Sequence, residues 1–198
     1  MRNVENIRAV EHIARPDLMG FVFYPNSPRY VSFVPQYLPN VPRVGVFVRP
    51  EEANVLRIAR QFDLWGVQLY EPTPSLCEHL RLYGLHVIVA LAAHSDLDVL
   101  TTPYAKVTDH FLFDTPSYTF GGSGRSFDHS LLTSYHGQVP FMVSGGLNPH
   151  SIDTILKIKH PRFEGVDLNS GFEVKVAIKE PTLLRDFIRR LRTALDSK

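Results

Sequence analysis

Cysteine is almost absent from this sequence, because the chain of 198 residues contains only one, Cys77. A single cysteine excludes an internal disulfide and any metal site built from several cysteines. Such sparing use of cysteine is typical of a reducing compartment, so we expect a cytoplasmic location. Cys77 lies in the middle of a predicted helix, where we expect a buried thiol and no nucleophile.

Net charge and long apolar runs are also lacking. The 21 lysines and arginines nearly balance 20 aspartates and glutamates, which leaves a formal charge of +1. This balance predicts no nucleic-acid partner and no membrane partner, whereas a small phosphorylated ligand needs only a local positive site. No apolar run approaches the roughly 20 residues that span a bilayer. The nine histidines show no ligand spacing such as His-Glu-x-x-His, so we expect no metal.

Seven short apolar segments predict β-strands. Their polar and apolar residues do not alternate, as expected for a parallel sheet that is covered on both faces. The predicted strands are residues 19–24, 43–48, 66–70, 86–92, 110–115, 140–145 and 165–170.

Helical patterns lie between the predicted strands. The clearest covers residues 181–195, and another opens the chain with an apolar stripe over residues 4–13 and Asn3 as its N-cap. Four prolines between residues 25 and 39 leave little room for a long helix there. The other predicted helices are residues 51–62, 74–83, 126–135 and 149–158, with a weaker pattern over 96–105.

Strand–helix units of about 25 residues predict an α/β fold, either an open doubly wound sheet or a (β/α)8 TIM barrel. The chain begins with a helix, which is unusual for a barrel. Seven strands with a leading helix therefore predict a barrel that lacks its first β-strand. No linker or change in composition divides the chain, so residues 1–198 are expected to form one domain.

Small residues follow the last two predicted strands, where α/β barrels bind phosphate. Their backbone N–H groups can approach an anion closely. The alternative is a pair of tight turns without a ligand. The residues concerned are Ser144, Gly145 and Gly146 after one strand, and Asn169, Ser170 and Gly171 after the next.

Asp114 closes the strand "HFLFDT" and is the candidate general acid. A carboxyl group next to Phe111 and Phe113, near the barrel mouth, has surroundings that favour the protonated form. The alternative is a turn or capping aspartate. The glycine-rich segment that follows, with Gly122, Ser123 and Gly124, predicts a loop that closes over a substrate.

Two further polar residues are predicted to point to the same rim. Arg29 lies in the proline-stiffened segment "FYPNSPRYV" and can hold a carboxylate with two parallel hydrogen bonds, although an ordinary surface arginine is the alternative. Gln68 lies near the end of the strand "GVQLY".

Five motifs together resemble the phosphoribosylanthranilate isomerase family. They are "GFVFYPNSPRYV", "GVQL", "FLFDT…GGSGRSFD", "SGGLNP" and "GVDLNSGFE", in the family's order and with similar spacing over nearly the whole chain. The resemblance implies a (β/α)8 barrel of tryptophan biosynthesis that uses no cofactor or metal and acts as a monomer or homodimer. It implies the Amadori rearrangement of N-(5-phosphoribosyl)anthranilate to 1-(2-carboxyphenylamino)-1-deoxyribulose 5-phosphate.

The same resemblance implies a role for each matching residue. Asp114 would protonate the ribose ring oxygen, and Arg29 would hold the anthranilate carboxylate. Gly122, Ser123 and Gly124 would form the loop beside the substrate. The two groups of small residues after the last strands would bind the phosphate through backbone amides.

The sequence departs from the family at several places. The family begins with a strand carrying Lys-x-Cys-Gly, whose cysteine is the general base, and this sequence starts just after that motif, at Met1. Tyr70 stands where the family commonly has histidine, and residues 173–180 lack the usual Pro-Gly segment. Three explanations of the first departure remain open: a misassigned or truncated start, a diverged inactive relative, or a strand supplied by another chain.

Two classes of function follow. The first is the isomerase, with activity impaired by the missing base, and the second is a non-catalytic relative that binds a phosphosugar. Other phosphate-binding barrels fit less well. An epimerase would need metal ligands at the strand ends, and an indole-glycerol-phosphate synthase would need lysines there, and the predicted strand ends show neither.

Overall fold

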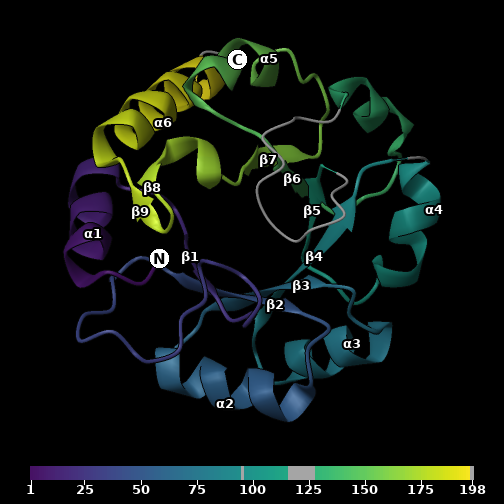
Figure 1. Cartoon of the computed structure of the whole chain (residues 1–198). Coiled ribbons are helices and arrows are strands. Elements are labelled where there is room, and N and C mark those ends of the chain that lie inside the picture. Colours follow the sequence, from purple (N-terminus) through teal and green to yellow (C-terminus); the bar gives the residue numbers. More distant parts are fainter. Residues whose placement is uncertain (95, 116–127, 197–198) are drawn as a thin grey trace.

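The structure is a computed structural model that describes residues 1–94, 96–115 and 128–196. It contains a sheet of seven parallel strands that pair in the order in which they occur in the chain. The sheet curls, with the helices on its outer side (Figure 1). The strands are β1 (Met19–Val22), β2 (Arg43–Val48), β3 (Gly66–Tyr70), β4 (His86–Ala92), β5 (His110–Asp114), β6 (Phe141–Val143) and β7 (Phe163–Val166).

All seven predicted strands are present, and β2, β3 and β4 have the predicted bounds. The last two strands differ more, because the glycines after β6 leave the extended conformation and β7 begins two residues earlier than predicted. A short antiparallel hairpin of β8 (Glu173–Lys175) and β9 (Ile178–Lys179) follows, which the sequence analysis did not predict.

Six α-helices are present in the described residues: α1 (Val4–Ala9), α2 (Glu52–Phe62), α3 (Pro74–Leu82), α4 (Leu97–Thr101), α5 (Ile152–Ile155) and α6 (Pro181–Asp196). As predicted, Asn3 caps α1, with its side chain accepting a hydrogen bond from the Asn6 amide at 2.8 Å. The first helix continues as a π-helical turn over Val10–Ala14.

Two predicted helices are much shorter in the structure. The prediction over 126–135 becomes a 3₁₀ helix over His129–Ser134, and that over 149–158 becomes a 3₁₀ turn followed by α5. Serine, aspartate and asparagine side chains compete for backbone groups and favour caps and turns over helix interiors. Asp128 and Asn148 show this directly, because each side chain accepts a hydrogen bond from the backbone at the start of its segment.

Both faces of the sheet are covered, which explains why the strands are apolar throughout. Along β4, Val87 and Val89 pack into the large cluster shared with the outer helices, whereas Ile88 and Ala90 belong to a small inner cluster. Among the described residues, that inner cluster has four buried members: Val44, Ile88, Ala90 and Leu112. The inner face is therefore only partly filled by side chains.

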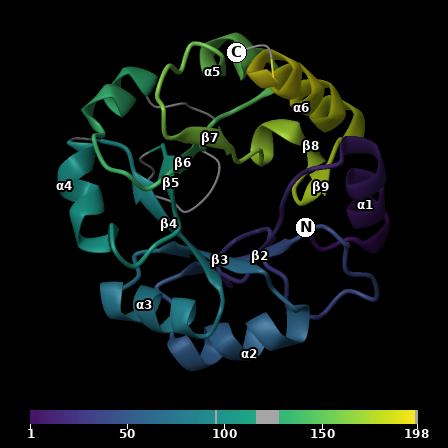
Figure 2. The same cartoon turned by 180° about the vertical axis from the view of Figure 1, so that it is seen from behind.

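Strands β1 and β7 are the two edges of the sheet. Met19 and Phe23 direct their N–H groups to the β2 side, so Gly20 presents its polar groups to the opposite side. There the amino group of Met1 donates to the Gly20 carbonyl at 2.8 Å. The chain therefore starts inside the curl, next to β1 (Figures 1 and 2). We call the space lined by β1, β7 and the inner side of α6 the β1–β7 gap.

A search of the helices in the described ranges found none whose length and apolar content would suffice to cross a bilayer.

Two leucines of α3 allow the packing of the outer core to be tested with a matched control. Leu80 is completely buried, whereas Leu82, two residues later, is 82% exposed. We expect Leu80→Ala to lower the free energy of unfolding by about 2–5 kcal/mol, and Leu82→Ala to change it by less than about 0.5 kcal/mol. Urea unfolding followed by circular dichroism measures both, and equal losses would contradict this packing.

Candidate active site

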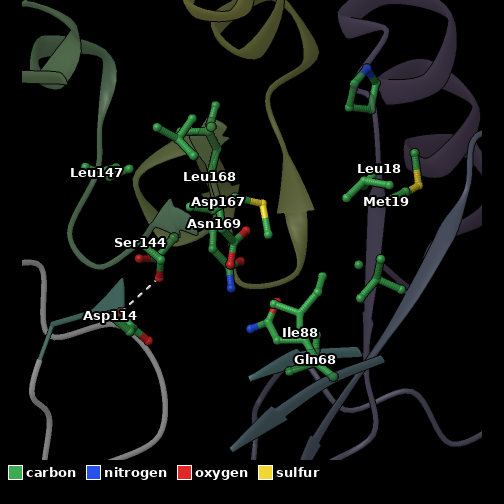
Figure 3. Close-up of a pocket in the computed structure, with 18 of the residues that line it drawn as sticks. Leu18, Met19, Gln68, Ile88, Asp114, Ser144, Leu147, Asp167, Leu168 and Asn169 are labelled. Atoms are coloured by element: carbon green, nitrogen blue, oxygen red, sulfur yellow. Dashed lines mark hydrogen bonds between the residues drawn. The ribbon is translucent and has the colours of Figure 1, made fainter. Parts of the chain in front are cut away.

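A cavity of about 620 Å³ opens at the carboxyl ends of the strands and continues into the β1–β7 gap. Polar residues gather at its rim: Arg29, Gln68, Tyr70, Asp114, Ser144, Asp167 and Asn169. Figure 3 shows Asp114 and Ser144 beside one another, with Asp167 and Asn169 reaching into the space from the end of β7. The curl of the sheet therefore brings side chains from four strand ends to one place.

The side chain of Asp114 accepts three hydrogen bonds from described residues. Its Oδ1 accepts from the Thr115 amide at 2.8 Å and from the Ser144 hydroxyl at 2.9 Å. Its Oδ2 accepts from the Tyr70 hydroxyl at 2.9 Å. These donors come from β3, from the turn after β6 and from the end of β5 itself, so the carboxyl group is held in one orientation.

Tyr70 reaches Asp114 across the intervening strand β4. Register pairs Tyr70 with Ala90, and Ala92 with Asp114. On this face of the sheet, Ala90 and Ala92 therefore place only methyl groups between the two side chains. Burial, and next the negative charge of Asp114, raise the pKa of Tyr70 well above its usual value, so the phenol keeps its proton. Gln68, predicted to face the rim, is buried there and donates to the Tyr70 hydroxyl at 3.3 Å.

The two glycine turns predicted to bind phosphate lie against one another. Gly145 and Gly146 have φ angles of +89° and +64°, a region that residues with a side chain rarely adopt. Gly171 supports this turn from behind, since a Cβ there would lie 2.1 Å from the Leu147 carbonyl oxygen. Of the six predicted phosphate residues, all except Gly171 line the cavity. The turns thus expose backbone to the cavity on the side where Asp114 stands.

Arg29 also lines the cavity, but it already has a partner. Its Nε and Nη2 donate to the two carboxylate oxygens of Glu173 at 2.9 and 2.7 Å. Burial would raise the pKa of Glu173, but the hydrogen bonds from Arg29 and Lys179 outweigh it, so that this pKa is lowered and the group stays ionised.

Three rim residues were missed by the sequence analysis: Asp167, Glu173 and Lys179. Burial, and then the charge of Asp114, raise the pKa of Asp167, against an opposing effect of Lys179. Asp167 had a usable signal, because it follows a strand just as Asp114 ends one. Glu173 and Lys179 had none, since only the hairpin β8–β9 brings them to the rim.

Gly122, Ser123 and Gly124 lie outside the described residues. Cys77 is buried within α3 and is not among the residues that line the cavity. Burial raises the pKa of its thiol to about 11, as expected for a core cysteine. Across residues 1–94, 96–115 and 128–196, no group of three or more histidine, cysteine, aspartate or glutamate side chains is arranged to hold a metal ion.

Comparisons with known proteins agree on one family. The sequence model of N-(5'-phosphoribosyl)anthranilate isomerase matches residues 3–190. The isomerase of this name from Phocaeicola vulgatus is 45% identical over 196 residues, which cover 97% of this chain and 95% of the relative.

Solved structures show the same likeness. The phosphoribosyl anthranilate isomerase from Thermotoga maritima superposes with a TM-score of 0.77 at 29% identity, covering 98% of this chain and 96% of the other. A second isomerase structure, in complex with reduced 1-(o-carboxyphenylamino)-1-deoxyribulose 5-phosphate, gives a TM-score of 0.75 at 28% identity, with 98% and 95% covered.

The close approach at Gly145 yields a prediction with a matched control. In Gly145→Ala the new Cβ would lie 2.6 Å from the Thr115 backbone nitrogen, whereas Gly84, with a similar φ of +83°, faces open space. Both substitutions strain the backbone by about 1–2 kcal/mol, but only Gly145→Ala also overpacks its site, at about 1–3 kcal/mol more. Thermal unfolding of the two variants measures the difference, and equal losses would show that the turn at Gly145 does not pack against Thr115.

Proposed function

Because this chain belongs to the N-(5'-phosphoribosyl)anthranilate isomerase family, we propose that it binds N-(5-phosphoribosyl)anthranilate and catalyses its Amadori rearrangement. The product would be 1-(2-carboxyphenylamino)-1-deoxyribulose 5-phosphate, and the pathway is tryptophan biosynthesis. One observation supports this proposal most strongly. A carboxyl group held by three donors stands at the same rim as two glycine turns that expose backbone.

In the proposed reaction Asp114 is the general acid. Among the described residues, its Oδ1 accepts two hydrogen bonds and its Oδ2 accepts one, from Tyr70, so we assign the transferable proton to Oδ2. That proton passes to the ribose ring oxygen as the bond from this oxygen to C1 breaks, and the amine lone pair forms a C=N bond to C1. A general base takes the C2 proton, which gives an enolamine. Protonation at C1 with release of the C2 hydroxyl proton then gives the ketone, so no oxidant or reductant is needed.

The rest of the rim holds the substrate. We assign the phosphate to Ser144, Gly145 and Gly146 together with Asn169, Ser170 and Gly171, and the anthranilate carboxylate to Arg29, with Gln68 beside it. Gly122, Ser123 and Gly124 remain the proposed loop over the substrate. We also propose that the enzyme needs no cofactor or metal, is cytoplasmic, and is a monomer or homodimer.

The β1–β7 gap is the proposed place of an eighth strand. Gly20 presents polar groups to it, the Met1 amino group already pairs with β1 there, and the cavity continues into it. A parallel strand in this gap would complete a (β/α)8 barrel. In this proposal residues 1–198 form a single barrel domain without its first strand. We propose that residues 1–198 alone are a poor isomerase, since Cys77 cannot act as the general base.

Replacing Asp114 tests the assignment of the acid. We expect Asp114→Asn to lower kcat by about 10²- to 10⁴-fold with little change in the affinity for a phosphorylated product analogue. The control is Asp153→Asn on α5, whose side chain is 78% exposed and far from the rim. Fluorescence of the anthranilate adduct follows the reaction. Unchanged turnover in Asp114→Asn, measured in a form that is active, would refute the role of Asp114 as acid.

Adding a strand tests the barrel proposal. We expect residues 1–198 preceded by a strand with the Lys-x-Cys-Gly motif to show a higher melting temperature. Its kcat/KM should rise by about 10²- to 10⁴-fold, because a general base is restored. The matched control has serine at that cysteine and should recover the stability but not the rate. If the extended protein stays inactive and Asp114→Asn has no effect, the chain is instead a non-catalytic phosphosugar-binding relative.

A further inference from the structure

Lys179 belongs to a compact cluster of charges at the edge of the cavity, together with Arg29 and Glu173. The Oε1 of Glu173 accepts from both Arg29 Nε at 2.9 Å and Lys179 Nζ at 2.8 Å, while its Oε2 accepts from Arg29 Nη2 at 2.7 Å. One carboxylate therefore holds two cations next to each other, and all three residues line the cavity.

The fold fixes this cluster through contacts distant in sequence. Glu173 and Lys179 are paired across the hairpin β8–β9. The Asn6 side chain in α1 then bonds both backbone groups of Lys179, accepting from its N–H and donating to its carbonyl, each at 2.8 Å. These two hydrogen bonds give the backbone of Lys179 one defined position, which a flexible surface lysine would not have.

The cluster has more positive than negative charge. The side chains of Arg29, Glu173 and Lys179 are only 12%, 5% and 10% exposed, and a buried cation without a counter-charge is costly. Asp167 is the next carboxyl group facing Lys179, but burial and the charge of Asp114 raise the pKa of Asp167 and so oppose its ionisation. An anionic ligand in the cavity would supply the second negative charge.

Both cations retain donors for such a ligand. Arg29 has five N–H donors, of which Glu173 takes two. Lys179 has three, of which one is directed to Glu173 and one to the Asn169 side chain. The remaining donors belong to two neighbouring groups, which is the arrangement that binds the two oxygens of a carboxylate.

We propose that Lys179 is a second substrate-binding cation, which shares the aryl carboxylate with Arg29, and that Glu173 is the positioning residue that holds the two cations side by side. This inference rests on the proposed function, because it takes the carboxylate of the aryl amine as the anion. The phosphate is assigned elsewhere, to the glycine turns at residues 144–146 and 169–171. The contact of Lys179 with Asn169 makes the phosphate the competing partner, and the test separates the two.

The experiment combines a protein change with a ligand change. Calorimetric titration measures the Kd of two ligands: reduced 1-(o-carboxyphenylamino)-1-deoxyribulose 5-phosphate, and the same compound with phenyl in place of o-carboxyphenyl. We expect Lys179→Met to weaken binding of the carboxylate ligand by about 10- to 100-fold, the size of a lost hydrogen bond to a charged group. Binding of the phenyl ligand should change by less than threefold.

Matched variants exclude a merely structural effect. Lys175→Met removes an exposed lysine from the same hairpin and should leave both affinities unchanged. Lys179→Arg keeps the charge and should recover most of the loss seen in Lys179→Met. Glu173→Gln should weaken only the carboxylate ligand, since Arg29 and Lys179 lose their common partner. Melting curves confirm that each variant is folded.

The outcomes separate the two hypotheses. Equal weakening of both ligands in Lys179→Met would place Lys179 at the phosphate and overturn the inference, as would no weakening at all. If Lys179→Met does not fold, Lys179→Arg and Glu173→Gln are compared with the wild type instead. Weakened binding of the carboxylate ligand alone supports the inference, and equal weakening of both ligands overturns it. If the wild type binds neither ligand, the proposed function itself fails and the inference fails with it.

Discussion

Parallel pairing of neighbouring strands in chain order constrains everything else in this protein. Each strand must be followed by a crossover connection before the next strand can pair in parallel, and this connection is helical after most strands but not between β1 and β2. All seven carboxyl ends therefore meet at one rim as the sheet curls. The loops and strand ends at that rim supply the polar groups, while the strands themselves remain apolar. The cavity and its chemistry are therefore a consequence of topology, and no single loop creates them.

The same constraint accounts for the incomplete interior. A curled parallel sheet fills its inside with side chains when it closes, but here the inner cluster has four buried members and β1 and β7 stay unpaired with each other. The cavity consequently runs from the rim into the β1–β7 gap. The amino group of Met1 lies at this gap and donates a hydrogen bond to the Gly20 carbonyl.

Charge at the rim is arranged in two separate groups. The carboxyl group of Asp114 is held by neutral donors, namely two hydroxyls and one amide. Glu173 is held by two cations, so its own charge is neutralised and a positive charge remains. Asp167 lies between the groups and interacts with both.

The sequence by itself determined the positions of the seven strands and their apolar character, the capped first helix, and the residues Asp114 and Gln68 toward strand ends, because these depend on local patterns along the chain. It also placed the glycine turn after β6, since the positive φ angles of Gly145 and Gly146 leave few alternatives to glycine. Only the tertiary structure decided three contacts. Tyr70 reaches Asp114 across β4, Glu173 forms an ion pair with Arg29, and the Asn6 side chain forms hydrogen bonds with the backbone of Lys179. Those contacts join residues up to 173 positions apart, and no local pattern encodes which distant side chains a curled sheet and a hairpin bring together.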